Sequence, residues 1–251
     1  NYNMRIKIEK SVKEYNQDVK KHGGYLYTQN KLSAKIATKR QTDEIIYLIK
    51  KYFPKKIKIL DVGCGDGEYT IEIYKNIKPK LIVGTDNAKN AIKVARKKIN
   101  NKNNSRIKFE LGSAYNLKKY KKYKFDLILI RGLLHHLYKP SNAVLELSEI
   151  SNSVMILEPN GYNPILKIIE KTSKYHIRHE EKSYFPFLLN SWFTNNGYQI
   201  KEQRIFGLVP YFCSDKIAKF LKTVEPIFEK HVFVKNLCCG SYIALYKNKS
   251  S

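Results

Sequence analysis

Cysteine is scarce in this sequence of 251 residues, and the positions of the few cysteines argue against a zinc-binding protein and against a disulfide-stabilised protein. The four cysteines are Cys64, Cys213, Cys238 and Cys239, and none shows the Cys-x-x-Cys spacing typical of a zinc site. Two of them are adjacent, which also argues against a disulfide framework. We therefore expect the protein to occupy a reducing, cytoplasmic environment.

Long apolar runs, low-complexity linkers and internal repeats are also missing. No stretch is apolar for long enough to cross a bilayer, and the first residues lack the apolar centre of a signal peptide. The length suits one substantial domain with its own hydrophobic core. The sequence accordingly predicts a globular protein with no membrane span.

Arginine is rare among the cations. Only 7 of the 47 basic residues are arginine, although the formal net charge is +25. Strong basicity is typical of nucleic-acid-binding proteins, but dedicated nucleic-acid sites favour arginine for bidentate contacts. A lysine-rich amino-acid composition is also expected of a protein encoded by an AT-rich genome. The composition therefore favours a solvated lysine surface and leaves an RNA partner open as the alternative.

Strand-like apolar runs alternate with helical patterns from residue 57 onwards. The predicted strands cover 57–62, 81–85, 106–111, 125–130 and 153–157, followed by two late strands over 198–206 and 240–246. The predicted helices cover 68–77, 88–99, 141–150, 165–173 and 187–195. Because such alternation implies right-handed crossovers, the sequence predicts an α/β fold. We expect a Rossmann-like, doubly wound, mostly parallel seven-stranded sheet with helices on both faces.

Two further segments flank or interrupt this pattern. Residues 1–56 are lysine-rich and polar, and they predict a helical N-terminal extension or lid before a main domain over 57–251. An insertion over 207–236 contains an amphipathic helix near 214–224, and it either covers the site or builds a dimer contact. We expect a monomer or a homodimer.

The most informative motif is a glycine turn, Ile-Leu-Asp-Val-Gly-Cys-Gly-Asp-Gly-Glu-Tyr-Thr at 59–70. Gly63, Gly65 and Gly67 stand where a strand gives way to a helix, so a flat ligand can lie against bare backbone. The spacing differs from the Gly-x-Gly-x-x-Gly of dinucleotide folds, and a Walker P-loop is absent. Asp86 follows about twenty residues later, where a carboxylate can accept both ribose hydroxyls of an adenosine.

Asp-Val-Gly-Cys-Gly-Asp-Gly at 61–67 and Gly-Thr-Asp at 84–86 resemble the class I S-adenosylmethionine-dependent methyltransferases, over about residues 57–160. The resemblance implies a methyl-transferring enzyme with S-adenosylmethionine as cofactor. It also implies the residues that bind this cofactor: Asp61, Gly63, Cys64, Gly65, Asp86, Asn87, Ser113, Ala114 and Arg131. Ser113 stands where the family usually has an acidic residue that reads the adenine amino group, and its hydroxyl is expected to bind adenine less tightly.

The segment Arg-Gly-Leu-Leu-His-His-Leu at 131–137 faces the substrate in this family. It lacks the Asn-Pro-Pro-Tyr type of motif carried by enzymes that methylate exocyclic amines of bases, which favours an oxygen acceptor. His135 and His136 are candidates to accept the proton that an alcohol or acid loses, and a packing or capping role is the alternative. Glu158, after the fifth strand, is a candidate base or substrate contact. Its alternative is a carboxylate tied to backbone N–H groups.

The loop over 175–185 combines histidines, an arginine and aromatic residues. That composition suits a polar, partly stacking substrate pocket, and equally a solvated loop without a ligand. His179 is its candidate catalytic residue. We expect no metal site, because His176, His179 and Glu180 lack a recognised ligand spacing.

Three functions fit these patterns. The leading one is a methyltransferase acting at oxygen on a small-molecule or carbohydrate-like acceptor, such as a sugar. In it, Tyr27 would close over the methionine part of the cofactor and Arg40 would meet its carboxylate; simple surface packing is the alternative. The second is a tRNA or rRNA methyltransferase that uses the basic surface, with an affinity that falls steeply with salt. The third is a binding protein that keeps the fold without catalysis.

Overall fold

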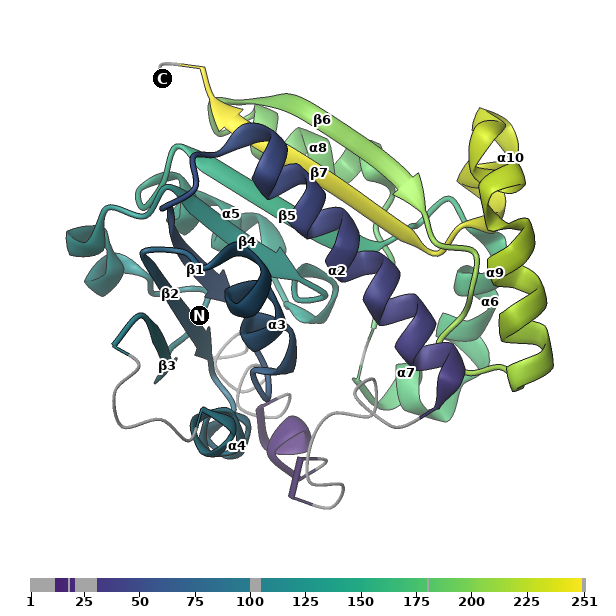
Figure 1. The fold of residues 1–251 in the computed structure, drawn as a ribbon, viewed down its shortest axis with the longest axis horizontal. Coiled ribbons are helices and arrows are strands. Elements are labelled where there is room, and N and C mark those ends of the chain that lie inside the picture. The colour runs from purple at the N-terminus through teal and green to yellow at the C-terminus, as the bar shows by residue number, and fades with distance from the viewer. Residues whose placement is uncertain (1–11, 18, 21–30, 100–104, 180, 250–251) are drawn as a thin grey trace.

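The computed structural model describes residues 12–17, 19–20, 31–99, 105–179 and 181–249, apart from the side chains of residues 175, 178 and 179. Within these residues one seven-stranded sheet forms the centre of the molecule (Figure 1). Its strand order is β3-β2-β1-β4-β5-β7-β6. The predicted α/β fold with seven strands is therefore confirmed.

Six strands run in one direction, and the last strand in the chain runs opposite to them. The strands are β1 (Lys58–Val62), β2 (Leu81–Asp86), β3 (Ile107–Leu111), β4 (Leu127–Arg131), β5 (Ser153–Pro159), β6 (Tyr198–Phe206) and β7 (Ser241–Asn248). Strand β7 lies between β5 and β6 and runs antiparallel to both. Val62, the last residue of β1, lies beside Thr85 of β2 and Ile130 of β4, so the carboxyl ends of these three strands meet at one edge.

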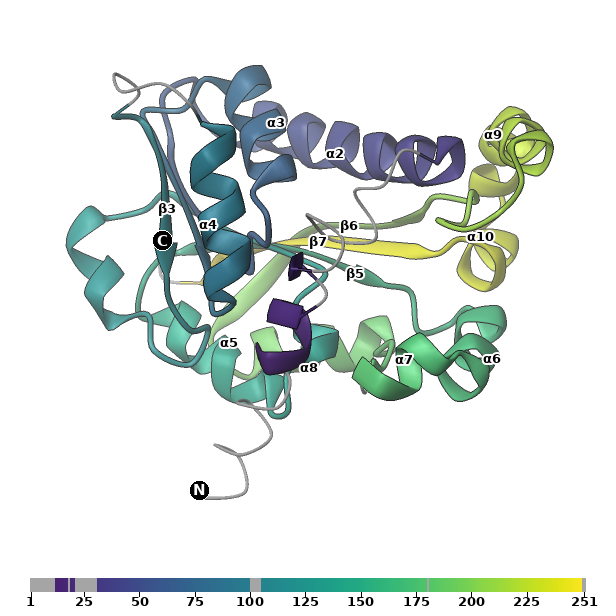
Figure 2. The same cartoon turned by 90° about the horizontal axis from the view of Figure 1, so that it is seen from below.

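Helices cover both faces of this sheet (Figure 2). Those before β5 are α2 (Leu32–Tyr52), α3 (Glu68–Ile77), α4 (Lys89–Lys98) and α5 (Pro140–Ser148). Those after it are α6 (Pro164–Thr172), α7 (Lys174–His179), α8 (Pro186–Thr194), α9 (Asp215–Lys230) and α10 (Val232–Cys238). Two short 3₁₀ helices, η2 (Lys118–Tyr123) and η3 (Leu134–His136), lie between the strands, and residues 12–17 near the start of the chain are also helical. None of the described helices is long and apolar enough to cross a membrane.

Two apolar cores lie on opposite faces of the sheet. Residues of α2, α3 and α4 pack on one face, and Ile45, Ile73 and Ile92 are their buried centres. Residues of α5 and α8 pack on the other, through Leu147 and Phe193 among others. The middle residues of β1, β4 and β5 are apolar on both faces because a parallel sheet is covered on both sides.

The structure differs from the sequence prediction in two segments after β5. The first part of the predicted loop over 175–185 is helical, as α7. The amphipathic helix predicted near 214–224 extends to Lys230 and passes through Pro226. Glu225 and Glu229, on either side of this proline, both form ion pairs with Arg40 of α2. These contacts offset the missing proline N–H, which normally ends or kinks a helix.

Candidate functional site

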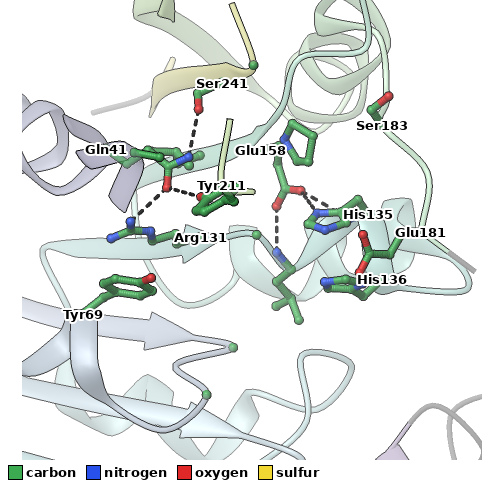
Figure 3. Close-up of a pocket in the computed structure, with 18 of the residues that line it drawn as sticks. Gln41, Tyr69, Arg131, His135, His136, Glu158, Glu181, Ser183, Tyr211 and Ser241 are labelled. Atoms are coloured by element: carbon green, nitrogen blue, oxygen red, sulfur yellow. Dashed lines mark hydrogen bonds and ion pairs between the residues drawn. The ribbon is translucent and has the colours of Figure 1, made fainter. Parts of the chain in front are cut away.

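A cavity of about 760 Å³ opens at the carboxyl ends of β1, β2, β4 and β5 (Figure 3). Parallel α/β sheets bind their ligands at this edge, because the loops that leave the strands meet there. The late helices α6 and α9 wall the cavity on opposite sides of the sheet plane (Figure 2). Its volume falls within the range typical of small-molecule sites.

The glycine turn forms one wall, and its backbone is in the left-handed region. The φ angles of Gly63, Gly65 and Gly67 are +80°, +55° and +77°. A Cβ atom built on Gly63 would approach three side-chain carbons of Leu133 at 3.0 Å, and one on Gly67 would come within 2.7 Å of Phe109. Glycine is therefore required by conformation and by space, and bare backbone faces the cavity.

Asp86, at the end of β2, is fixed against this turn. The Gly65 N–H donates to its Oδ2 at 2.9 Å, and the Ala88 N–H donates to its Oδ1 at 2.8 Å. Burial raises the pKa of the Asp86 carboxyl, and the hydrogen bonds from backbone N–H groups oppose that rise. Each oxygen has a second lone pair for a ligand hydroxyl, so the carboxylate is preset to bind a diol.

Asp61 lies deeper in the same wall and is 4% exposed. The Thr70 hydroxyl donates to its Oδ2 at 2.5 Å. Burial raises the pKa of this carboxyl to about 6, although the Thr70 hydrogen bond and the charge of Arg131 oppose the rise. Asp61 thus carries a negative charge at neutral pH that the folded chain only partly neutralises.

The remaining predicted cofactor residues also line the cavity: Cys64, Asn87, Ser113, Ala114 and Arg131. Burial raises the pKa of the Cys64 thiol, which keeps it neutral and unreactive. The Ser113 hydroxyl accepts a hydrogen bond from the Tyr115 N–H at 3.2 Å, as a turn residue does, and it still borders the cavity.

The side chain of Arg131 reaches across to α2. It donates to the Thr42 hydroxyl at 2.8 Å, to the Gln41 side-chain oxygen at 2.9 Å and to the Thr38 carbonyl at 3.1 Å. Its guanidinium carbon lies 3.6 Å from the centre of the Tyr69 ring. Among the described residues no carboxylate lies within salt-bridge distance of Arg131, so hydrogen bonds and the Tyr69 ring hold its guanidinium.

Gln41 links this network to Tyr211 and to Ser241, the first residue of β7. Its side-chain oxygen also accepts from the Tyr211 hydroxyl at 2.7 Å, and its amide nitrogen donates to the Ser241 hydroxyl at 2.8 Å (Figure 3). Sequence reasoning missed Gln41, Tyr69 and Tyr211, because no local pattern separates them from ordinary surface residues. They come together only through the packing of α2 over the sheet.

Arg40 borders the cavity but its guanidinium is already occupied. It pairs with Glu44 at 2.7 Å, Glu229 at 3.0 Å and Glu225 at 3.3 Å. Three carboxylates leave it little positive charge to offer a ligand carboxylate, so the structure favours packing over the predicted ligand contact. Tyr27, the other predicted lid residue, lies outside the described residues.

Glu158 and His135 form a buried pair at the base of the cavity. His135 Nδ1 lies 2.6 Å from Glu158 Oε2 (Figure 3). The same carboxylate accepts from the N–H groups of Leu133, Leu134 and His135, which begin η3. Burial lowers the pKa of His135, but the charge and hydrogen bond of Glu158 outweigh this effect, and the pKa is raised. Glu158 thus has its carboxylate tied to backbone N–H groups, the alternative weighed from the sequence.

His136 lies beside His135, with 3.8 Å between the ring centres. The Tyr15 hydroxyl is 2.7 Å from its Nδ1, and Glu181 Oε1 is 3.9 Å from the same nitrogen. His176 Nε2 lies 3.2 Å from Glu181 Oε2. Tyr15 and Glu181 were not predicted individually, although Glu181 belongs to the loop that the sequence marked as a candidate pocket.

Two other residues predicted from this loop have side chains that the structure does not describe. The side chain of His179, the fourth catalytic candidate, lies outside the described part of the chain, and so does Glu180. The backbone of His179 ends α7. The structure therefore brings together His135, His136 and Glu158 and leaves His179 a prediction.

Known proteins match this chain in sequence. The model of a family described as "Methyltransferase domain" matches residues 54–206, more than half of the chain. An uncharacterized methyltransferase from Schizosaccharomyces pombe is 32% identical over 123 residues, which cover 45% of this chain and 40% of that protein. A tRNA U34 carboxymethyltransferase from Campylobacter fetus is 36% identical over 105 residues, 41% of this chain and 36% of that protein. The match thus spans less than half the length of either relative.

Solved structures match the fold over more of the chain. The magnesium protoporphyrin IX methyltransferase of Synechocystis gives a TM-score of 0.62 at 13% identity, covering 88% of this chain and 89% of that one. A putative sarcosine dimethylglycine methyltransferase from Galdieria sulphuraria gives 0.63 at 15% identity, covering 85% and 87%. At such identities the likeness concerns the fold, and it confirms a Rossmann-like architecture.

Proposed function

Because this chain belongs to the methyltransferase domain family, the Rossmann-like proteins that use S-adenosylmethionine as cofactor, we propose that it transfers a methyl group to an oxygen of a small-molecule acceptor. The cofactor supplies an electrophilic methyl group on its sulfonium. The main task of the chain is therefore to hold an acceptor oxygen in line with that group.

The cavity wall fits this cofactor. Glycine backbone at 63 and 65, where a Cβ atom would intrude or be strained, gives a flat surface for a nucleoside. The fixed carboxylate of Asp86 suits the ribose hydroxyls, and the buried carboxylate of Asp61 suits the positively charged methionine end. We assign the adenine edge to Asn87, Ser113 and Ala114, which border the same wall.

The proposal of an oxygen acceptor rests on the pair of histidines, His135 and His136, next to the cavity wall that fits the cofactor. An alcohol or acid acceptor loses a proton when it is methylated, and His135 and His136 are the groups at the cavity base suited to promote that loss. Glu158 acts as a positioning residue, since its carboxylate already accepts four hydrogen bonds. It fixes η3 and orients His135.

The walls beyond the histidines favour a small acceptor with an apolar part. Ile165, Leu166 and Ile169 of α6 line one side, and Leu221 and Phe228 of α9 line the other. Tyr115 and Tyr184 add polar edges. Such a mixed lining suits an acceptor with an apolar body better than a bare sugar. On this proposal the insertion that contains α9 covers the site.

An RNA acceptor is the second candidate, because one relative is a tRNA U34 carboxymethyltransferase and the net charge is +25. Methyl transfer from labelled S-adenosylmethionine separates the two. The acceptors to compare are aliphatic and aromatic alcohols, small acids, sugars and bulk RNA, each at 50 and 200 mM salt. We expect label in an alcohol or acid, with little effect of salt. Label confined to RNA, with a steep loss at 200 mM, would support the RNA alternative instead.

A non-catalytic protein would bind the cofactor and label none of these acceptors. Failure to bind S-adenosylmethionine in isothermal titration would contradict both enzyme functions.

The four cysteines, all free, accord with the reducing cytoplasmic setting proposed from the sequence.

A further inference from the structure

Three potential metal ligands converge at the base of the cavity. One ring nitrogen of His135, one of His136 and one carboxylate oxygen of Glu181 lie within 4.8 Å of one another. His135 and Glu181 are buried and His136 is partly buried (Figure 3). Two imidazoles and one carboxylate form a set that suits Zn²⁺, Fe²⁺ and related divalent ions.

The outer partners of this cluster are those that metal sites use. Glu158 holds Nδ1 of His135, which leaves the Nε2 lone pair of this ring for a ligand bond. Tyr15 holds Nδ1 of His136, and His176 holds Oε2 of Glu181. Carboxylate, hydroxyl and imidazole partners of this kind orient metal ligands and tune their basicity.

One carboxylate oxygen of the cluster, Glu181 Oε1, is buried without a hydrogen bond to any described residue. Glu181 is 7% exposed, and its Oε1 has no hydrogen-bond partner within the described residues. No described lysine or arginine forms an ion pair with Glu158 or Glu181, so the ion pairs of these two buried carboxylates are with histidines, although Glu158 also accepts from three backbone N–H groups. Leaving a buried carboxylate oxygen without a hydrogen bond is costly, and a bound cation would remove that cost.

We propose that His135, His136 and Glu181 bind one divalent transition-metal ion, of the Zn²⁺ or Fe²⁺ class, beside the acceptor position. Ligand bonds of about 2.1 Å place neighbouring ligand atoms about 3 to 3.5 Å apart, so the cluster tightens by about 1 to 2 Å around the ion. Glu181 lies between α7 and α8, outside any helix or strand, which leaves its side chain free to make that approach.

The use of this ion in catalysis rests on the proposed function, whereas metal binding does not. The acceptor hydroxyl coordinates the ion, its pKa falls, and its proton leaves to water. The oxygen then forms its bond to the methyl carbon as the carbon–sulfur bond breaks, and the electron pair of that bond returns to sulfur. His135 and His136 act as ligands in this scheme, and the ion takes over the task of promoting proton loss.

Metal binding is tested directly on the full chain after dialysis against a chelator. Isothermal titration with Zn²⁺ and the ligand-field spectrum after Co²⁺ addition report binding without any turnover. We expect one ion per chain. Glu158→Gln removes an outer partner and should weaken Zn²⁺ binding by about 10- to 100-fold. Glu181→Gln and His136→Ala remove ligands and should each weaken Zn²⁺ binding by more than that.

His231→Ala is the matched control, because His231 is exposed between α9 and α10 and does not line the cavity. It should bind Zn²⁺ as the wild type does. Unchanged affinity for S-adenosylmethionine in each variant shows that the fold is intact. Less than one ion per wild-type chain, or wild-type affinity in both ligand variants, would overturn the site.

Activity after chelation separates this inference from the proposed function. Loss of small-molecule methylation in chelator, with recovery on adding Zn²⁺ or Fe²⁺, supports the catalytic role of the ion. Undiminished methylation in chelator refutes that role and leaves the oxygen acceptor standing. One bound ion without methylation of any small molecule leaves the metal site standing and refutes the proposed acceptor.

Discussion

The guanidinium of Arg131 lies over the ring of Tyr69, 3.6 Å from its centre, and this contact joins the end of β4 to the first turn of α3. The same guanidinium donates three hydrogen bonds to α2. One side chain thus joins β4 to both α2 and α3, and its charge opposes the rise in the pKa of the Asp61 carboxyl.

Replacing Arg131 with Met should destabilise the domain by about 2 to 4 kcal/mol, because charged hydrogen bonds and a cation–π contact disappear together. Urea unfolding measures the loss. Lys75→Met, on the exposed side of α3, is the control and should change stability by less than about 0.5 kcal/mol. Equal stability of the two variants would show that the network is redundant.

The pH dependence of stability should reveal Asp61. Its pKa rises from 3.8 to about 6 on folding, so the native state holds this proton more tightly than the unfolded chain. The contribution is fully present below about pH 4 and is lost as the pH rises through 6. At about 1.4 kcal/mol per pKa unit, the charged form costs about 3 kcal/mol above pH 7.

Asp61→Asn should therefore unfold at higher urea than the wild type at pH 8, and at nearly the same urea at pH 4. It should also bind S-adenosylmethionine more weakly, since it lacks the charge that we assign to the methionine end. A stability difference that is independent of pH would contradict the raised pKa.

Asp86→Asn should weaken S-adenosylmethionine binding by about 10- to 100-fold, because an amide offers one acceptor oxygen where the carboxylate offers two, without the charge. Isothermal titration gives the affinity directly. Glu149→Gln, an exposed acidic position after α5, should bind normally. Normal binding by the Asp86 variant would move the ribose to another part of the cavity.

Ser113→Asp should tighten S-adenosylmethionine binding by about 3- to 10-fold. A carboxylate accepts the adenine amino proton through a charge-assisted hydrogen bond, roughly twice as strong as that of a hydroxyl. Ser113→Ala serves as the comparison and should bind about as the wild type or slightly more weakly. Tighter binding by both variants would mean that the side chain at 113 does not face adenine.

The sequence predicted the parts of this protein that depend on local pattern. Helix α3 begins and ends at the predicted residues, 68 and 77, and β6 occupies the predicted 198–206. Each has a clear periodicity, and α3 follows a glycine that fixes its start. The predicted cofactor residues all line one cavity, because they stand at strand ends that a parallel sheet brings together.

Contacts between distant segments were beyond local pattern. The Tyr15 hydroxyl meets His136 across 121 residues, and Arg40 meets Glu229 across 189. Such pairs depend on how helices are placed over the sheet, which periodicity does not encode. Helix α7 was likewise missed, because its six residues, Lys174–His179, are too few to show a helical repeat.

The position of α2 has a consequence for how the protein is synthesised. Ile45 and Leu48 of this helix belong to the same core as Ile243 and Leu245 of β7, and its Arg40 meets α9. The helix emerges from the ribosome about 200 residues before those partners, at roughly 5 to 20 residues per second. The part of its apolar face that packs against β7 waits some tens of seconds for that strand, an interval in which chaperone binding would protect the nascent polypeptide.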